Sequence, residues 1–345
     1  MRKSGLVRAR APLRLGLAGG GTDVSPYADE FGGYILNVTI DKYAYATLEE
    51  RDDDQLELIA ADNEVKWQGA AVAHVETVCG LELHTGVYNR VVRDFNGGRP
   101  LPLTIVTHSE APPGSGLGSS STMVVALLQA FVEYLSLPLG EYEVAHLAYE
   151  IERIDLGMAG GRQDQYAATF GGLNFMEFHG DSVIINPLRL KQHVKAELES
   201  SLVLFYTGVS RESARIIQQQ TDNVRKGNNV SLDALHAVKR EAVRMKEAIL
   251  KGDFASFTES MRQGWEAKKK MASAISNPMI DRIHDVAIQA GALAGKVSGA
   301  GGGGFMMFMV DPRNRPSVIR ALDKLEGRIF NCNLTEQGAH SWCVS

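Results

Sequence analysis

Residues Pro112 to Ser121 read PPGSGLGSSS, and an apolar segment, Thr122 to Leu135, follows directly. Glycines let the backbone approach an anion with no Cβ in the way, and the start of a helix carries partial positive charge. The three serines supply hydroxyls and caps at the expected helix start. The stretch therefore predicts a phosphate cradle that leads into a helix. The alternative is an ordinary glycine-rich turn before a buried helix.

No GxxxxGKS or GxxxxGKT sequence occurs in the chain, which excludes the P-loop version of a phosphate site. A chain of 345 residues is longer than a single hydrophobic core usually supports, and its length suggests two domains. A formal net charge of -5 argues against a general nucleic-acid binder. Three cysteines without a CxxC pair indicate neither a disulfide framework nor a structural zinc site. No run approaches 18 apolar residues, so we expect no signal peptide, no membrane contact and a cytoplasmic location.

Hydrophobic periodicity predicts a mixed α and β first half and a helical second half. The first half is expected to hold strands at 33–48, 101–108 and 172–178 and helices at 122–135, 141–153 and 164–170, with the helix at 122–135 apolar nearly all round and buried. The pattern changes near Pro187, which predicts domains at 1–187 and 188–345. The second half is expected to hold helices near 210–225, 231–250, 253–274, 277–291 and 316–326, a strand at 305–310 and a last strand toward Cys343.

A second glycine-rich loop runs from Val297 to Gly304. Its Gly299-x-Gly301-x-x-Gly304 pattern fits the dinucleotide fingerprint, but that fingerprint follows a strand and opens a helix. Here the loop is expected to follow a helix and open a strand, so we discount a dinucleotide oxidoreductase. The remaining interpretation is a tight turn where backbone approaches another segment, for which the first glycine loop is a candidate.

Two further glycine-rich turns carry ionisable groups. The segment from Pro12 to Asp23 reads PLRLGLAGGGTD and places Arg14 nine residues before its carboxylate. The segment from Glu152 to Asp164 reads ERIDLGMAGGRQD and places two carboxylates around such a turn. A lone carboxylate is usually a surface group, but four glycine-rich segments flanked by ionisable groups are hard to explain as turns alone.

Together these segments resemble the GHMP kinases, the family of galactokinase, homoserine kinase, mevalonate kinase and phosphomevalonate kinase. PPGSGLGSSS is similar to the family's nucleotide loop, and KVSGAGGGG at 296–304 is similar to its C-terminal glycine motif. The resemblance implies a two-domain α+β fold, with an N-terminal domain like ribosomal protein S5 domain 2 and a C-terminal ferredoxin-like α/β sandwich. It implies ATP and Mg²⁺ as cofactors. The implied ATP-binding residues are Pro113, Gly114, Ser115, Gly116, Leu117, Gly118, Ser119, Ser120, Ser121, Gly299, Ala300 and Gly301.

The N-terminal segment is similar to the substrate motif of the family's sugar kinases, with Pro12, Arg14, Thr22 and Asp23 in register. It departs from galactokinases at Gly20-Gly21, where those enzymes usually carry Glu-His. The Gly-Gly-Gly-Thr-Asp form resembles the heptose 7-phosphate kinases and the L-fucose kinases, of which the first fits a short chain better. The resemblance thus implies ATP-dependent phosphorylation of D-glycero-D-manno-heptose 7-phosphate at its anomeric hydroxyl. The 1,7-bisphosphate would enter nucleotide-activated heptose synthesis for surface polysaccharide.

Residue roles follow from the same resemblance. Ser120 and Glu152 would hold magnesium against the ATP phosphates, an all-oxygen set that suits this ion. Asp164 would contact the acceptor hydroxyl, and Arg14 would lie near the acceptor or the γ-phosphate. The substrate-binding set is then Arg14, Gly20, Gly21, Thr22, Asp23, Gly161, Arg162, Asp164 and Arg211. In it Asp23 would accept hydrogen bonds from ring hydroxyls, and Arg162 and Arg211 would serve a distal phosphate.

Several alternatives stay open. They are an L-fucose kinase or another sugar 1-kinase, a mevalonate kinase, and a catalytically inactive regulator that binds sugar and ATP. The mevalonate branch favours a lysine where this chain has Arg14, and retention of Ser120, Glu152 and Asp164 weighs against a regulator. The expected partners are a small sugar phosphate and ATP, with no nucleic acid and no membrane. The expected oligomeric state is a monomer or a homodimer.

Overall fold

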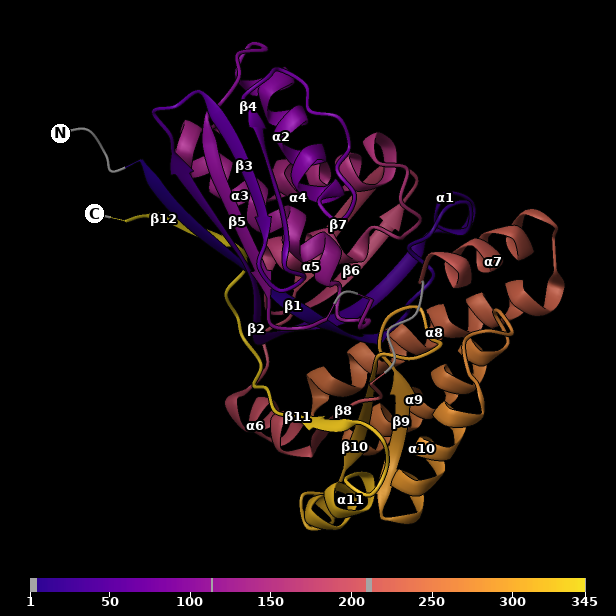
Figure 1. Ribbon diagram of the computed structural model, residues 1–345. Helices are drawn as coiled ribbons and strands as arrows, with labels where there is room; N and C mark the ends of the chain where they lie inside the picture. Colours follow the sequence, from indigo (N-terminus) through magenta and orange to yellow (C-terminus); the bar gives the residue numbers. More distant parts are fainter. Residues whose placement is uncertain (1–4, 113, 209–212, 345) are drawn as a thin grey trace.

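The computed structural model describes residues 5–112, 114–208 and 213–344, which form two β-sheets with helices packed on them (Figure 1). Among these residues the first sheet has eight strands in the order β12-β1-β2-β5-β3-β4, with β6 paired to β2 and β7 to β6. Its strands are β1 (Leu6–Ala18), β2 (Gly33–Glu50), β3 (Gln55–Ala60), β4 (Val65–Ala70), β5 (Leu103–Ser109), β6 (Leu173–His179), β7 (Ser182–Pro187) and β12 (His340–Cys343). Within the same described part, the second sheet is antiparallel with the order β11-β8-β10-β9. Its strands are β8 (Leu202–Tyr206), β9 (Ala292–Val297), β10 (Phe305–Val310) and β11 (Arg328–Phe330).

The helices divide between the two sheets (Figure 1). Those beside the first sheet are α1 (Tyr27–Phe31), α2 (Glu82–Phe95), α3 (Ser119–Leu135), α4 (Glu141–Glu150), the π-helical turn Ile151–Asp155 and α5 (Gln163–Phe170). Those beside the second are α6 (Gln192–Ser201), α9 (Phe254–Lys269), α10 (Pro278–Gln289) and α11 (Arg315–Leu322). Helix α8 (Asn229–Lys251) packs on β1 and β2 of the first sheet and on α9, and α7 (Ser213–Arg225) packs on α8. In the described part of the chain, no helix is both long and apolar enough to cross a membrane.

Helix α3 is the central helix that its composition predicts. It packs on β1 and β2 and is flanked by α2, α4 and α5. Its residues from Thr122 to Leu128 are all buried. It begins at Ser119 rather than Thr122, so the three serines form its first turn.

Several elements were not predicted, namely α1, α2, α6, β1, β3, β4, β7, β8, β9 and β11. One of them corrects an argument about the second glycine loop. That loop follows strand β9, not a helix, and joins it to β10 as an antiparallel hairpin. The helix before it ends at Gln289, which leaves room for a strand of six residues that periodicity does not separate from the helix. A dinucleotide fold remains disfavoured because the loop opens a strand.

The C-terminal half of strand β1 belongs to an apolar core that both sheets share. Leu13, Leu15 and Leu17 pack in one apolar cluster with residues of β8, α8 and β10. Lys296 on β9 also donates hydrogen bonds to the carbonyls of Gly16 and Leu17, the second at 3.0 Å. These contacts hold the second sheet against the strand that carries Arg14.

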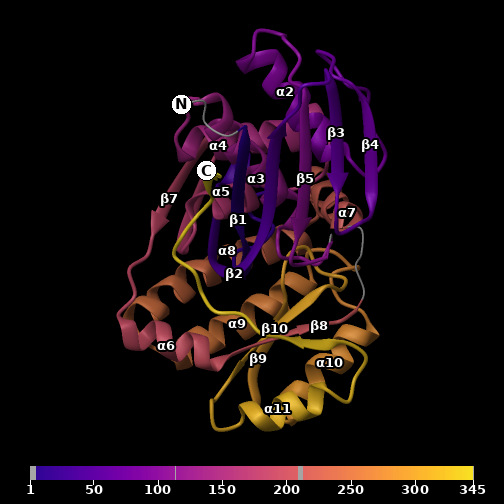
Figure 2. The same cartoon turned by 60° about the vertical axis from the view of Figure 1, so that its left-hand side comes forward.

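The last strand joins the first sheet. β12 pairs antiparallel with β1, from Val7 opposite Cys343 to Arg10 opposite His340 (Figure 2). The chain therefore returns from the second sheet to the edge of the first. The boundary at residues 187 and 188 stays a prediction, although the pairing of β12 attaches 340–343 to the sheet of the first part.

Candidate active site

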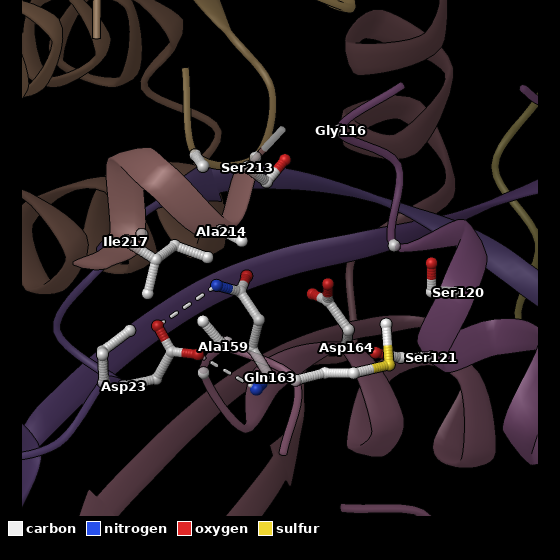
Figure 3. A pocket seen from close by; sticks show the side chains of 18 of the residues that line it. Asp23, Gly116, Ser120, Ser121, Ala159, Gln163, Asp164, Ser213, Ala214 and Ile217 are labelled. Carbon is white, nitrogen blue, oxygen red and sulfur yellow. Dashed lines mark hydrogen bonds between the residues drawn. The ribbon is translucent and has the colours of Figure 1, made fainter. Parts of the chain in front are cut away.

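A cleft of about 630 Å³ lies where the glycine-rich turns meet the starts of α3, α5 and α7 (Figure 3). Most of the predicted site residues line it: Arg14, Gly20, Gly21, Asp23, Gly114, Gly116, Gly118, Ser119, Ser120, Ser121, Glu152, Gly161, Asp164, Gly299 and Ala300. Ser115, Leu117, Thr22, Arg162 and Gly301 do not line it. Pro113 and Arg211 lie outside the described residues.

The first glycine loop turns on left-handed residues. Gly114, Gly116 and Gly118 have φ of 69°, 84° and 78°, a region that residues with a Cβ rarely adopt. Gly118 is the N-cap of α3, and no side chain caps that helix. The predicted capping by the serines is therefore wrong, because Ser119 to Ser121 already lie in the first turn. The uncapped amides at this helix start face the cleft and suit a phosphate.

The second glycine loop packs directly on the first, as predicted. The Ser298 hydroxyl donates to the Gly116 carbonyl at 2.9 Å, and the Phe305 amide donates to the Ser115 carbonyl at 2.9 Å. A Cβ at Gly304 would come within 2.2 Å of the Ser115 carbonyl oxygen. Only glycine allows this approach, so the two loops form one continuous wall of backbone.

Arg14, which is buried, and Asp164, which is partly exposed, form an ion pair in the cleft. The guanidinium Nε and Nη2 of Arg14 each lie 2.7 Å from Asp164 Oδ1, and Nη1 donates to the Gly116 carbonyl. No described residue donates a hydrogen bond to Asp164 Oδ2, and the Asp164 side chain is 22% exposed. One carboxylate oxygen is thus oriented by Arg14, and the other remains available to a hydroxyl in the cleft.

Glu152 is the candidate metal ligand, and its surroundings fit that role. It lies in the π-helical turn Ile151–Asp155, a type of irregularity that recurs at functional sites. The carboxylate is fully buried, and burial raises its pKa. Oε2 accepts a hydrogen bond from Gln165, whereas Oε1 has no hydrogen-bond partner among the described residues. Arg153 Nη1 forms an ion pair with Oε1 at 3.7 Å, which is beyond hydrogen-bond distance, so this oxygen has a cationic neighbour but still lacks the close partner that a metal ion would supply.

Two family models match the chain. Residues 82–172 match the GHMP kinases N terminal domain, and residues 245–327 match GHMP kinases C terminal. The chain is 45% identical over 339 residues to D-glycero-alpha-D-manno-heptose 7-phosphate kinase of Campylobacter jejuni, covering 98% of this chain and 99% of that protein. The chain belongs to the GHMP kinase family. The predicted fold is thereby confirmed, and this GHMP kinase is an ATP-dependent phosphotransferase.

Two other relatives bear on the acceptor of this kinase. It superposes with a TM-score of 0.85 on the solved structure of a D-glycero-D-manno-heptose 1-phosphate kinase from Bacteroides thetaiotaomicron, at 46% identity over 98% of this chain and 99% of that one. It is also 26% identical to the L-fucokinase/L-fucose-1-P guanylyltransferase of Bacteroides fragilis. That match covers 92% of this chain and 36% of the longer protein.

Asp23 of this GHMP kinase is buried and holds the turn before α5. Its Oδ2 accepts from the amides of Arg162 and Gln163 at 3.0 and 3.1 Å, and Oδ1 accepts from the Gln163 side chain at 3.2 Å (Figure 3). Gly161 lies against the same carboxylate, where a Cβ would come within 2.0 Å of Oδ2. Asp23 therefore positions the turn that carries Asp164, and its contact with sugar hydroxyls stays a prediction.

Two residues that were predicted to bind substrate, Thr22 and Arg162, do not line the main cleft and contact other groups instead. The Thr22 hydroxyl donates to the carbonyl of Gly19 at 2.8 Å and accepts from the Tyr34 amide at 3.0 Å, which joins the turn to β2. The Arg162 guanidinium donates to the carbonyl of Gly180 and to Asp29 at 3.3 Å. Arg162 lines a smaller side pocket of about 170 Å³ rather than the main cleft. The cationic partner of Asp164 is accordingly Arg14, not the adjacent Arg162.

Sequence reasoning missed one wall of the kinase's cleft. Ser213, Ala214 and Ile217 of α7 face the other site residues (Figure 3). Gln220 of α7 and Lys268 of α9 also line the cleft. The α7 residues carry no motif that could have revealed them. Lys268 lies in a run of three lysines, a pattern typical of a solvated surface.

Proposed function

We propose that this chain transfers the γ-phosphoryl group of ATP to the anomeric hydroxyl of D-glycero-D-manno-heptose 7-phosphate, giving the 1,7-bisphosphate and ADP. The observation that carries the proposal is the 45% identity to the heptose 7-phosphate kinase, which extends over nearly the full length of both chains. The cleft supports it, because it joins a glycine-walled phosphate cradle to a carboxylate with one available oxygen.

The residues of the chain would divide the work as follows. The backbone of the first glycine loop and the start of α3 would bind the ATP phosphates. Asp164 Oδ2 would accept the hydrogen bond of the anomeric hydroxyl and hold it in line with the γ-phosphorus. The new bond from that oxygen to phosphorus forms while the bond to the ADP oxygen breaks, and the hydroxyl proton passes to Asp164. A strong base is unnecessary, because in a loose transition state the proton leaves late.

Arg14 would act from the opposite side of Asp164. Its two contacts with Oδ1 fix the carboxylate, and its contact with the Gly116 carbonyl ties the acceptor side of the cleft to the phosphate loop. Such positioning is the main demand that phosphoryl transfer makes of a protein.

Magnesium belongs to the proposal as well. Ser120 and Glu152 would hold the ion, which would offset charge on the ATP phosphates. In the described part of the chain no group of three or more His, Cys, Asp and Glu side chains could hold a metal. Two protein oxygens, with waters and phosphates completing the shell, are typical of Mg²⁺ bound with a nucleotide.

An acceptor panel tests the substrate. ATP is offered with heptose 7-phosphate, heptose 1-phosphate, heptose, L-fucose, galactose and mevalonate, ADP release is measured, and ³¹P NMR locates the new phosphate. We expect the highest kcat/KM for heptose 7-phosphate and a new signal at C1. Preference for L-fucose or heptose 1-phosphate would replace the proposed acceptor.

The same panel tests catalysis itself. Binding of ATP and sugar without ADP release would favour the inactive regulator.

The cytoplasmic location and the monomeric or homodimeric state stay predictions.

A further inference from the structure

Lys268 is a buried cation that the proposed chemistry does not use. It lies near the end of α9, is only 4% exposed and lines the cleft, although its neighbours Lys269 and Lys270 are not buried. Among the described residues its ammonium has one hydrogen-bond acceptor, the carbonyl of Gly299 at 2.6 Å. An ammonium carries three donors, so this bond leaves two for other partners.

No carboxylate among the described residues pairs with Lys268 within 4.0 Å. The nearby acids have other partners. Asp164 binds Arg14, and Asp23 accepts bonds from the turn before α5. Glu241, which lines a small cavity together with Lys268, pairs with Arg244 at 2.9 Å. Two further cations, Arg14 and Lys296, act on the same region. Buried charges in proteins are normally paired, since an unpaired one costs several kcal/mol. Lys268 is thus a buried cation of the cleft that forms no ion pair with a described residue.

The space around the ammonium is built from small residues. Gly20 lies so close that a Cβ there would come within 3.1 Å of Lys268 Nζ, and Gly21 has a φ of 103° that favours glycine. Gln220 and Ser213 of α7 line the cleft beside this turn. The Gly20–Gly21 turn therefore leaves the cation open to the cleft on one side, with the second glycine loop on the other.

We propose that Lys268 binds a phosphate group between the Gly20–Gly21 turn and Gly299. The chemistry matches, because a lysine ammonium acts as a point charge toward a phosphate oxygen and the phosphate supplies the missing counter-ion. The phosphate comes from one of two sources, the γ-phosphate of ATP or a distal phosphate on the acceptor. The inference rests on the proposed function only if the phosphate is the one on the acceptor.

The test compares Lys268→Met and Lys268→Arg with the wild type and with Lys269→Met, a half-buried neighbour on the same helix that does not line the cleft. Binding of ADP, of a non-hydrolysable ATP analogue and of the sugar phosphate is measured by calorimetry. A charged hydrogen bond contributes about 1.5–3 kcal/mol, so Lys268→Met should weaken one phosphate ligand about 10- to 150-fold. Lys268→Arg should restore part of the loss, and Lys269→Met should bind like the wild type.

The two sources give different patterns. If Lys268 holds the γ-phosphate, Lys268→Met loses affinity for the ATP analogue but not for ADP. If it holds the acceptor phosphate, the variant loses affinity for the sugar phosphate but not for the same sugar without phosphate. Unchanged binding of every ligand, or equal weakening of all of them, would overturn the inference.

This outcome is separable from the proposed function. A wild-type chain that phosphorylates no heptose refutes the heptose assignment. In that case the phosphate site would still be supported if Lys268→Met bound the ATP analogue no more tightly than it binds ADP. Folding is checked by thermal unfolding without ligand, where removal of an unpaired buried charge should leave the Lys268→Met midpoint at or above that of the wild type.

Discussion

Asp164 is the residue on which turnover should depend most. Asp164→Asn keeps the size of the side chain but removes the charge that Arg14 orients and the group that accepts the hydroxyl proton. We expect turnover to fall about 10²- to 10⁴-fold with little change in sugar affinity. Steady-state kinetics with sugar binding measured separately will check this. The exposed Asp181→Asn serves as the matched control, and an unchanged turnover in Asp164→Asn would reject the role.

Glu152 gives a prediction about metal dependence. Glu152→Gln replaces a carboxylate oxygen that has no hydrogen-bond partner among the described residues with a neutral group of the same shape. We expect the Mg²⁺ concentration for half-maximal activity to rise about 10- to 100-fold, the range typical of weakened metal sites. The free energy of unfolding without ligand is measured in parallel and should fall, because the substitution also removes the ion pair between Arg153 Nη1 and Glu152 Oε1, which lie 3.7 Å apart. An unchanged Mg²⁺ titration would contradict the assignment.

Lys268 gives a prediction about pH. Burial, followed by the charge of Arg14, lowers the pKa of Lys268 to about 8 from 10.5. Below pH 8 both the folded and the unfolded chain carry the proton. Between pH 8 and 10.5 only the unfolded chain does, so this group makes the folded state more stable as pH rises. The charged groups acting on Lys268 are Arg14, Asp23, Asp164 and Lys296.

The measurement is urea unfolding of the ligand-free protein from about pH 7 to about pH 10. Relative to Lys268→Met, the wild type should gain on the order of 3 kcal/mol across this window, from the roughly 1.36 kcal/mol that each pH unit represents. Phosphate binding by the wild type should weaken over the same range as the ammonium loses its charge. Parallel stability curves for the two proteins would show that Lys268 does not titrate there.

At the scale of elements, the contact between the two glycine loops gives a further prediction. Gly304→Ala places a Cβ 2.2 Å from the Ser115 carbonyl oxygen, at a φ of 81°. The loops must separate, which removes the Phe305 to Ser115 hydrogen bond and disturbs the phosphate cradle. We expect the affinity for ADP to fall at least tenfold. The free energy of unfolding should fall by more than the cost of a left-handed residue with a Cβ, which is about 1 kcal/mol.

Gly97→Ala is the control for this experiment. Gly97 also has a positive φ, of 61°, but no atom lies within 4 Å of the position that a Cβ would take there. It should therefore show only the backbone cost and normal ADP binding. Equal effects of the two substitutions would mean that the loop contact contributes nothing specific.

Elements with long apolar or glycine-rich signatures are predictable from sequence. The positions of α3, α8 and β10 follow from local periodicity, and the glycine turns follow from composition. Short strands such as β8 and β9 were not predicted, because five or six apolar residues next to a helix fit either state. The π-helical turn at Glu152 continues α4 without a break in the pattern, so periodicity does not distinguish it from the helix predicted at 141–153.

At the scale of the whole molecule, β12 ties the end of the chain to its beginning. Removing residues 339–345 eliminates the four residue pairs between β12 and β1 and the bonds from the Ala339 amide to the carbonyls of Ala168 and Thr169. With about 0.2–1 kcal/mol for each cross-strand pair, we expect a loss of about 1–4 kcal/mol in unfolding free energy. Urea denaturation will measure it, and full stability of the shortened chain would show that β12 contributes no net stability.

Local sequence is enough to predict which segments form glycine-rich turns and which helix is buried, because glycine conformations and apolar periodicity act between near neighbours. Which charges meet depends on the packing of the whole chain. Arg14 and Asp164 are 150 residues apart in the sequence. Lys268, on helix α9, donates a hydrogen bond to Gly299 in the second glycine loop. Arg162, two residues before Asp164 in the sequence, donates to the carbonyl of Gly180 instead. The direction and burial of a side chain depend on how the two sheets pack around β1, and no local pattern encodes that packing.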